Sequence, residues 1–314
     1  MQKDQPGESL GASTRGGRAA QAYREVGWNL RVMLTGAKGQ VGQEMSRAFS
    51  ERRIASEMAA MSRSEMDFTQ REQVYGAVVG FEPQVIIHLG AMTAVDLCEE
   101  EPDSAYLANA ISTRYLKQAA RLVGAKMVYL STDYVFDGHA TQPYREWDAT
   151  NPISVYGRSK LAGESELEPS DLVIRTSWVM GRYGKNILKT ILGAAKGTSE
   201  LRFVDDQIGS PTVAADLANA VISLVLEGHS GLFHLSNSGS LSWYELVRFI
   251  FGVIGADASR IVAIDSAELA MTRKAARPQY SVLDNCAWRL SGFATLPHYS
   301  EAVGSLALEL WREM

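Results

Sequence analysis

The chain has 314 residues, of which 46% are apolar and 21% charged, and its formal net charge is −5. At ~100–200 residues per domain, this length predicts one large α/β unit or two closely associated lobes. A mildly acidic chain without a long basic run argues against a nucleic-acid partner, and no apolar run approaches the ~20 residues that a membrane span needs. Cys98 and Cys286 stand far apart, which excludes a disulfide scaffold and a cysteine zinc site and is typical of a cytoplasmic protein.

Residues 1–28 are polar, rich in Gly and Ser, and aperiodic. They have no central apolar stretch and so do not resemble a secretory signal, while Asp4 and Glu8 count against a transit peptide. We therefore expect a disordered extension that lies outside the fold.

From Leu30 onward, short apolar runs alternate with segments of helical spacing. Continuous apolar strands between amphipathic helices are typical of a parallel sheet covered on both faces, and right-handed crossovers make such a sheet doubly wound. The expected strands are residues 30–36, 56–62, 83–91, 126–133, 171–179 and 231–236, and the expected helices are 41–49, 74–81, 102–124, 153–167, 214–228 and 242–255. The fold class is α/β, with a Rossmann-type sheet.

The last third of the chain is less regular. We expect a loop with short strands over residues 201–212 and a short strand over 260–264. Ser242 is the expected N-cap of its helix, because Glu245 follows at the capping-box spacing. We assign residues 29–175, with about 209–235, to a dinucleotide-binding domain, and 176–208 with 236–314 to a smaller substrate-binding lobe.

A glycine-spaced turn follows the first strand and opens the first helix. Gly36 allows a sharp turn, Gly39 lets the backbone approach a pyrophosphate, and Gly42 lets the helix pack close to the sheet. Together with the intervening Lys38, Gln40 and Val41, these glycines predict a dinucleotide-binding turn, because the strand–turn–helix context makes the spacing specific. The alternative is a tight turn without a ligand.

The end of the second strand predicts which nicotinamide cofactor binds. A carboxylate there would bind the ribose 2′-hydroxyl of NAD, but this region has Ser62 and Arg63, with Glu65 as the nearest acid. Arg63 can face a 2′-phosphate, which favours NADPH, although it could also be a solvated cation. Asp67 and Phe68 could bind and stack on the adenine.

Tyr156 and Lys160 are four residues apart at a predicted helix start and therefore share one helix face. A lysine cation beside a phenol is expected to lower the pKa of the tyrosine, which can then exchange a proton with a carbonyl or alcohol oxygen. Thr132, at the end of the fourth strand, can polarise that carbonyl. Asp133 is either a substrate-orienting acid or a loop cap, whereas His88 and His234 are expected to be core histidines.

At this point a family resemblance appears. The motifs TGAKGQVG, VIIHLGA with TAVD after it, STDYVFDG, YREWDATNPISVYGRSKLAGE, RTSW, DDQIGSPT and RPQYSVLDN stand in register. Together they resemble the dTDP-4-dehydrorhamnose reductase family of extended short-chain dehydrogenases/reductases. The resemblance runs from about Leu30 to the C-terminus.

The resemblance implies that the C4 ketone of a dTDP-linked 6-deoxyhexulose is reduced with NADPH, or with NADH, and that Tyr156 protonates the C4 oxygen. It implies that Lys160 also holds the nicotinamide ribose. Further residues that it places along the cofactor are Gly90, Ala91 and Thr93. Those that it places at the substrate are Val95, Asp133, Tyr134, Trp178 and Arg277.

The resemblance leaves some alternatives open. Some members carry magnesium at a dimer interface; Glu44 and Asp216 lie near matching positions, but Ala215 stands where a second acid is expected, so we predict no metal. Tyr134 in place of a second acid disfavours a 4,6-dehydratase, and Ser62-Arg63 disfavours a 4-epimerase that retains NAD. A reductase for another dTDP-4-keto-6-deoxysugar and a non-catalytic NADP-binding subunit, resembling that of methionine adenosyltransferase, remain alternatives. A homodimer is also left open.

Overall fold

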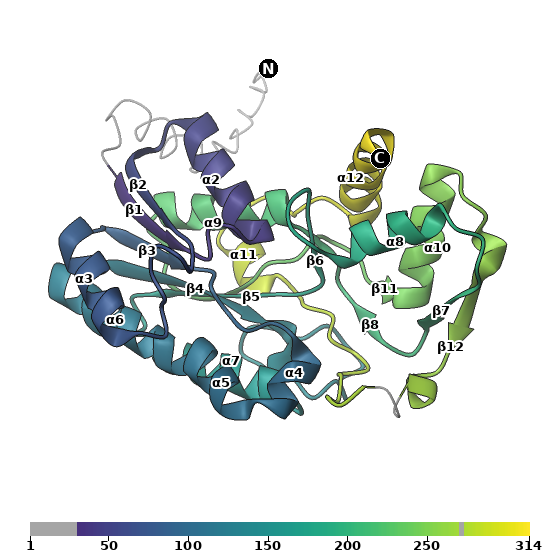
Figure 1. Cartoon of the computed structure of the whole chain (residues 1–314), viewed down its shortest axis with the longest axis horizontal. Coiled ribbons are helices and arrows are strands. Elements are labelled where there is room, and N and C mark those ends of the chain that lie inside the picture. Colours follow the sequence, from purple (N-terminus) through teal and green to yellow (C-terminus); the bar gives the residue numbers. More distant parts are fainter. Residues whose placement is uncertain (1–29, 270–272) are drawn as a thin grey trace, which may run out of the picture.

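The computed structural model describes residues 30–269 and 273–314, so the predicted extension over residues 1–28 lies outside the described residues. Six parallel strands form the central sheet, in the order β2-β1-β3-β4-β5-β10 (Figure 1). They are β1 (Leu30–Thr35), β2 (Ala55–Met61), β3 (Val85–His88), β4 (Lys126–Thr132), β5 (Leu172–Thr176) and β10 (Gly231–His234). The expected doubly wound parallel sheet is confirmed.

Helices cover both faces of this sheet (Figure 1). Their arrangement follows the alternation of side chains along the strands, since Val32 and Leu34 of β1 pack with α2 and α9 while Met33 packs with α3 and α6. The helices on the first face are α2 (Gln40–Arg52) and α9 (Ala214–Leu226), and those on the other are α3 (Arg71–Phe81), α6 (Ser112–Val123) and α7 (Val155–Glu164). Within the described residues, no helix is long and apolar enough to cross a membrane.

The helix expected over residues 102–124 is interrupted by a π-helical turn, Leu107–Ile111. It separates α5 (Pro102–Tyr106) from α6 (Ser112–Val123), and the short α4 (Val95–Glu100) precedes it. The turn carries Asn109, which is fully buried and bonds the backbone of Met92 and the hydroxyl of Ser159. π-turns inside helices often occur at functional sites, and this one joins the loop after β3 to α7.

A second apolar core lies beyond the sheet. It is formed by α8 (Ile187–Ala195), α10 (Trp243–Ile254) and α12 (Tyr299–Glu313), and the capping box of Ser242 and Glu245 is confirmed at the start of α10. The small strand pairs are β7 (Leu201–Val204) with β12 (Ile261–Ile264), β6 (Val179–Met180) with β9 (Thr212–Val213), and β8 (Ile208–Gly209) with β11 (Leu241–Ser242).

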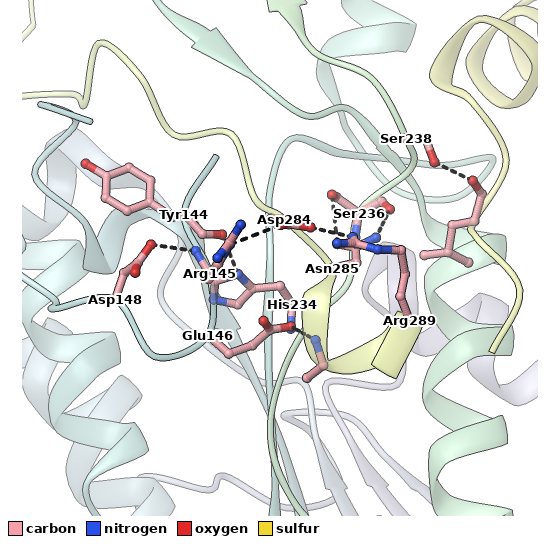
Figure 2. Close-up of polar contacts among 12 residues, drawn as sticks. Tyr144, Arg145, Glu146, Asp148, His234, Ser236, Ser238, Asp284, Asn285 and Arg289 are labelled. Atoms are coloured by element: carbon pink, nitrogen blue, oxygen red, sulfur yellow. Dashed lines mark hydrogen bonds and ion pairs between the residues drawn. The ribbon is translucent and has the colours of Figure 1, made fainter. Parts of the chain in front are cut away.

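A polar network attaches part of the C-terminal segment to the edge of the sheet (Figure 2). The carboxylate of Glu146 accepts hydrogen bonds from the backbone N–H groups of His234, at 3.0 Å, and Ala287, at 3.0 Å. Trp288, in α11 (Cys286–Leu290), belongs to the core beside α2 and α9. This part of residues 236–314 therefore packs against the sheet, and the division into two lobes at the boundaries given above remains our proposal.

The two core histidines are buried, as expected. His88 is 1% exposed and its Nδ1 lies 2.7 Å from the hydroxyl of Thr35, while the Nδ1 of the fully buried His234 lies 3.0 Å from the carbonyl oxygen of Tyr144. Burial lowers the pKa of each ring from 6.5 to about 3. Both rings are therefore neutral in the folded protein near pH 7.

The buried histidines predict an acid-sensitive fold. Below pH 6.5 the unfolded chain binds protons that the folded chain rejects until about pH 3, so each histidine removes about 1.4 kcal/mol of stability per pH unit in that range. We expect His234→Gln to flatten the pH dependence of the free energy of unfolding by about one proton between pH 6 and 4. Urea unfolding at several pH values measures this, with the exposed His139→Gln as control; equal slopes in wild type and His234→Gln would contradict it.

Candidate active site

A cavity of about 910 Å³ lies at the carboxyl edge of the sheet. It lies where the strand order reverses, between β1 and β3, the position at which ligands bind in open α/β sheets. Most of the predicted site residues line it: Gly36, Lys38, Gly39, Gln40, Val41, Gly42, Ser62, Arg63, Phe68, Gly90, Ala91, Thr93, Asp133, Tyr156, Lys160 and Trp178. Asp67, Val95, Thr132, Tyr134 and Arg277 are not in its lining.

The glycine turn is built by close backbone contacts. Gly36 has a φ of +67°, and a Cβ atom there would lie 2.8 Å from the backbone nitrogen of Gly90. A Cβ atom on Gly42 would lie 2.4 Å from the carbonyl oxygen of Gly36. No side chain caps α2 at Gly39, so the N–H groups of its first turn remain open toward the cavity, which fits the diphosphate of a dinucleotide.

The residues expected at the ribose and adenine lie at the β2 end of the cavity. The side chain of Arg63 is 85% exposed and lies 3.9 Å from Asp67, so it is free to turn toward a phosphate. Glu65 is directed to the backbone N–H of Ser62, at 2.6 Å. Asp67 accepts hydrogen bonds from the backbone and hydroxyl of Thr69, whereas Phe68 alone of this pair lines the cavity.

Tyr156 and Lys160 lie on the cavity side of α7, as their spacing predicts. α7 begins at Val155 because the side chain of Ser154 caps it by accepting the N–H of Gly157. The ammonium of Lys160, 2% exposed, donates to the carbonyl oxygen of Leu130 at 2.6 Å. This pair can hold a polar group of a ligand and pass a proton to it.

The pKa values in this pair differ from the expectation. Burial raises the pKa of Tyr156 well above its usual value, against a hydrogen bond from Thr132 that lowers it, and the carboxylate of Asp133 raises it further. Burial lowers the pKa of Lys160 to about 7. The predicted lowering of the tyrosine pKa by Lys160 is therefore wrong, because desolvation of the phenol dominates. Tyr156 holds its proton at neutral pH.

The residues after β4 surround the Tyr156 phenol. Asp133 is 2% exposed and lines the cavity; its Oδ1 accepts from Thr132 at 3.1 Å, and its Oδ2 has no partner among the described residues. Burial raises the pKa of Asp133 to about 6. The ring of Tyr134 meets that of Tyr156 edge to face, with centroids 5.5 Å apart. An unpartnered carboxylate oxygen supports the substrate-orienting alternative for Asp133 over the loop cap.

Trp178 lies at the junction of the two cores. Its backbone has a φ of +45°, a left-handed conformation that a bulky residue rarely adopts and that stores strain of about 1–3 kcal/mol. The indole stacks on Trp243, with ring centroids 3.7 Å apart. A Cβ atom on Gly209 would lie only 2.4 Å from Cε2 of this indole. It therefore both packs as a core residue and presents a surface to the cavity.

Arg277, expected at the substrate, is paired with the residue that follows Val95. Arg277 forms a two-point ion pair with Asp96, at 2.7 and 3.2 Å, and Asp96 directly follows Val95 in α4. Burial raises the pKa of Tyr134 to about 12, and the nearby charge of Arg277 opposes this rise. The pairing ties the RPQ segment to the loop that carries Thr93.

Sequence reasoning missed several residues of the site. Thr176, Ser177 and Lys185 line the cavity. Thr176 is the last residue of β5 and Ser177 follows it, so the rule that ligands lie at the carboxyl ends of strands could have found them. Asn109 also went unnoticed, although an asparagine in the middle of a helix is a poor helix former and is itself a signal.

The acidic residues considered for a metal site line another hollow, of about 450 Å³, with Glu301. Glu44 is bound by Arg47 at 3.0 Å, and Asp216 accepts from Asn237 at 2.8 Å. Among residues 30–269 and 273–314, no group of three His, Cys, Asp or Glu side chains could hold a metal ion. The absence of a metal remains a prediction.

Known proteins resemble this chain in family, in sequence and in structure. Residues 30–311 match the family model described as the RmlD substrate binding domain. The chain is 38% identical over 282 residues to a dTDP-4-dehydrorhamnose reductase of Streptomyces griseus, covering 87% of this chain and 91% of the relative. It is 35% identical over 277 residues to a dTDP-4-keto-6-deoxy-D-glucose reductase of Streptomyces niveus, covering 87% and 95%.

Among solved structures, a dTDP-4-dehydrorhamnose reductase from Bacillus anthracis in complex with NADP superimposes with a TM-score of 0.85. It is 37% identical to this chain, and the match covers 90% of this chain and 99% of that one.

The backbone contact at Gly42 predicts what a single methyl group does to the site. Gly42→Ala would place Cβ against the backbone of Gly36 and Ala37. Helix α2 would then have to move away from the glycine turn. We expect NADPH binding, measured by fluorescence titration, to weaken by at least about 10-fold, or about 1.4 kcal/mol. Gly76→Ala in α3 meets nothing within 4 Å and serves as control, with unchanged binding. Normal binding by Gly42→Ala would contradict the role of this contact.

Proposed function

Because this chain belongs to the dTDP-4-dehydrorhamnose reductase family, we propose that it reduces the C4 ketone of dTDP-4-dehydrorhamnose to dTDP-L-rhamnose with NADPH. The observation that carries the proposal is that Tyr156 and Lys160 line the same cavity as the glycine turn and Arg63. A proton donor, a buried cation and a phosphate-binding turn are thus gathered around one space.

The cofactor fits the residues that are present. Gly36 and Gly42 have no Cβ atoms, and the backbone packs closely at both positions, which leaves space for a diphosphate beside the turn. Ser62 and Arg63 line the cavity just beyond the end of β2. When bound, NADPH supplies the hydride that adds to C4. The chain contributes positioning and the second hydrogen, which must arrive at the C4 oxygen as a proton.

Tyr156 is the proposed source of that proton. As C4 gains the hydride, the C=O π electrons pass to the oxygen, the oxygen takes the phenolic proton, and the tyrosine is left as phenolate. The raised pKa of Tyr156 keeps it protonated before the reaction. Lys160 can then stabilise the phenolate by its charge, and Thr132 donates to the reacting oxygen.

The substrate side of the proposal rests on the residues at the junction of the two cores. Asp133, a buried carboxylate, lines the cavity together with Trp178, whose indole offers an aromatic face for the sugar. Three further residues are proposed to contact the nucleotide sugar from separate segments: Tyr134 after β4, Val95 at the start of α4, and Arg277 in the RPQ segment.

The sugar itself is the finer part of the proposal. The Streptomyces niveus relative carries the name of a reductase for another dTDP-4-keto-6-deoxysugar, which supports a test of both substrates. NADPH binding without turnover of either would favour the alternative of a non-catalytic NADP-binding subunit.

We also propose a cytoplasmic enzyme that engages neither nucleic acid nor membrane. The net charge of −5 and the free thiols of Cys98 and Cys286 support this location. A homodimer is part of the same proposal, and light scattering of the purified chain would test it.

Replacement of the proton donor tests the mechanism directly. We expect Tyr156→Phe to lower kcat for dTDP-4-dehydrorhamnose by at least about 100-fold. The phenyl ring keeps the packing but lacks the hydroxyl group that donates the proton. NADPH oxidation at 340 nm measures this. Tyr106→Phe, at an exposed phenol, is the control and should keep normal activity. A Tyr156→Phe enzyme with nearly normal kcat would refute the proposed chemistry.

Cofactor preference is tested at the end of β2. Arg63→Ala should raise KM for NADPH by about 10-fold through loss of a charge-assisted contact with the 2′-phosphate, and leave KM for NADH within about 2-fold. Arg71→Ala, which also removes an exposed arginine, is the control. Equal effects on the two cofactors would show that Arg63 is only a solvated cation.

A further inference from the structure

A buried ion pair lies one helical turn beyond Lys160. Glu164, the last residue of α7, accepts hydrogen bonds from Nε of Arg175 at 2.9 Å, from Nη2 of Arg175 at 2.7 Å, and from the hydroxyl of Ser131 at 2.5 Å. The side chains of Glu164 and Arg175 are only 10% and 5% exposed. The proposed reaction assigns no role to this cluster.

The cluster fixes the position of Lys160 through the backbone of β4. Ser131 and Arg175 stand opposite each other in the register of β4 and β5, so one carboxylate holds both strands to α7. Leu130, directly before Ser131, provides the carbonyl oxygen that accepts the Lys160 ammonium at 2.6 Å. The Glu164 contact therefore lies one residue from the contact that orients the lysine.

The cluster also sets the charge around Lys160. The groups packed against this lysine are His88 from β3, Tyr129 from β4, and Tyr156 and Glu164 from α7. The histidine and the two phenols are neutral near pH 7, because burial lowers the pKa of His88 to about 3 and raises the pKa of both tyrosines. Glu164 is the anion of this group, and it raises the lysine pKa that burial lowers to about 7.

We propose that Glu164 is a positioning residue of the reduction: its carboxylate holds Lys160 on the Leu130 carbonyl and keeps the lysine protonated, and so it sets the upper pH limit of activity. This inference rests on the proposed function, since it assumes that Tyr156 and Lys160 act together on the ketone. It adds a residue that touches neither substrate nor cofactor.

Glu164→Gln removes the charge and keeps the shape. We expect kcat to fall by about 10-fold at pH 8 but by less than about 3-fold at pH 6, because the lysine loses its proton about one pH unit earlier. KM for the keto sugar should stay within about 2-fold. Glu164→Asp retains the charge and should restore the upper pH limit of activity toward that of the wild type.

The matched control is Glu166→Gln. Glu166 lies just after α7 and, like Glu164, accepts two hydrogen bonds from one arginine, Arg114. The variant therefore removes the same charge and the same kind of pair. This variant should keep the wild-type pH profile. Coinciding profiles of Glu164→Gln and wild type, or an equal shift in Glu166→Gln, would overturn the proposal.

A second readout does not depend on turnover. The Cε resonance of Lys160 in carbon-13-lysine-labelled protein, assigned with Lys160→Arg, should titrate about one pH unit lower in Glu164→Gln than in wild type. An unchanged midpoint would overturn the role of Glu164. Absence of keto-sugar reduction by the wild type, with a shifted midpoint, would refute the proposed function alone.

Glu164→Gln leaves Arg175 buried without its anion and could fail to fold, which circular dichroism would reveal. The double variant Glu164→Gln/Arg175→Gln then replaces it, since it removes the buried arginine together with the carboxylate that raises the pKa of Lys160. Its lysine midpoint is expected to remain below that of the wild type, and a wild-type midpoint would overturn the proposal.

Discussion

Direct backbone contact among three glycines is the constraint on which the rest of the structure depends. Gly36 lies against Gly90 at the end of β3, and Gly42 lies against the carbonyl of Gly36. This contact lets α2 start at Gln40, one short turn after β1 ends at Thr35, so that its first N–H groups face the gap between β1 and β3. A cavity forms there because no side chain fills it, and the ends of β4 and β5 close its far side.

Burial of charge at the carboxyl edge is the second constraint. Lys160, Asp133 and Arg175 are each 4% exposed or less, and each would be costly to bury alone. The protein offsets this cost by pairing: Lys160 with a carbonyl, and Arg175 with Glu164. Asp133 retains one unpartnered oxygen among the described residues, and the neighbouring phenol keeps its proton. Asp133 and Lys160 both line the cavity, where a ligand can pair with them.

The sequence predicts the sheet, its helices and most of the cavity lining, because these follow from short-range patterns. Strand ends, the glycine turn and the spacing of Tyr156 and Lys160 are local features. What it could not predict depends on contacts between distant residues. The pKa of Tyr156 follows from how deeply several elements bury it together, and the pairing of Arg277 with Asp96 joins residues 181 positions apart. The π-turn at Asn109 arises likewise from partners at Met92 and Ser159.

Trp178 shows how the second core is coupled to the chemistry at the first. The residue follows β5 almost directly, so its backbone is placed by the sheet, yet its indole stacks on Trp243 at the start of α10. A left-handed backbone at a tryptophan persists only where surrounding packing compensates for the strain, and Gly209 and Trp243 provide that packing. The position of α10 therefore determines where the ring can lie. In the function proposed above, a sugar held against this ring would be oriented by both cores at once, which would link substrate selection to the packing of α10.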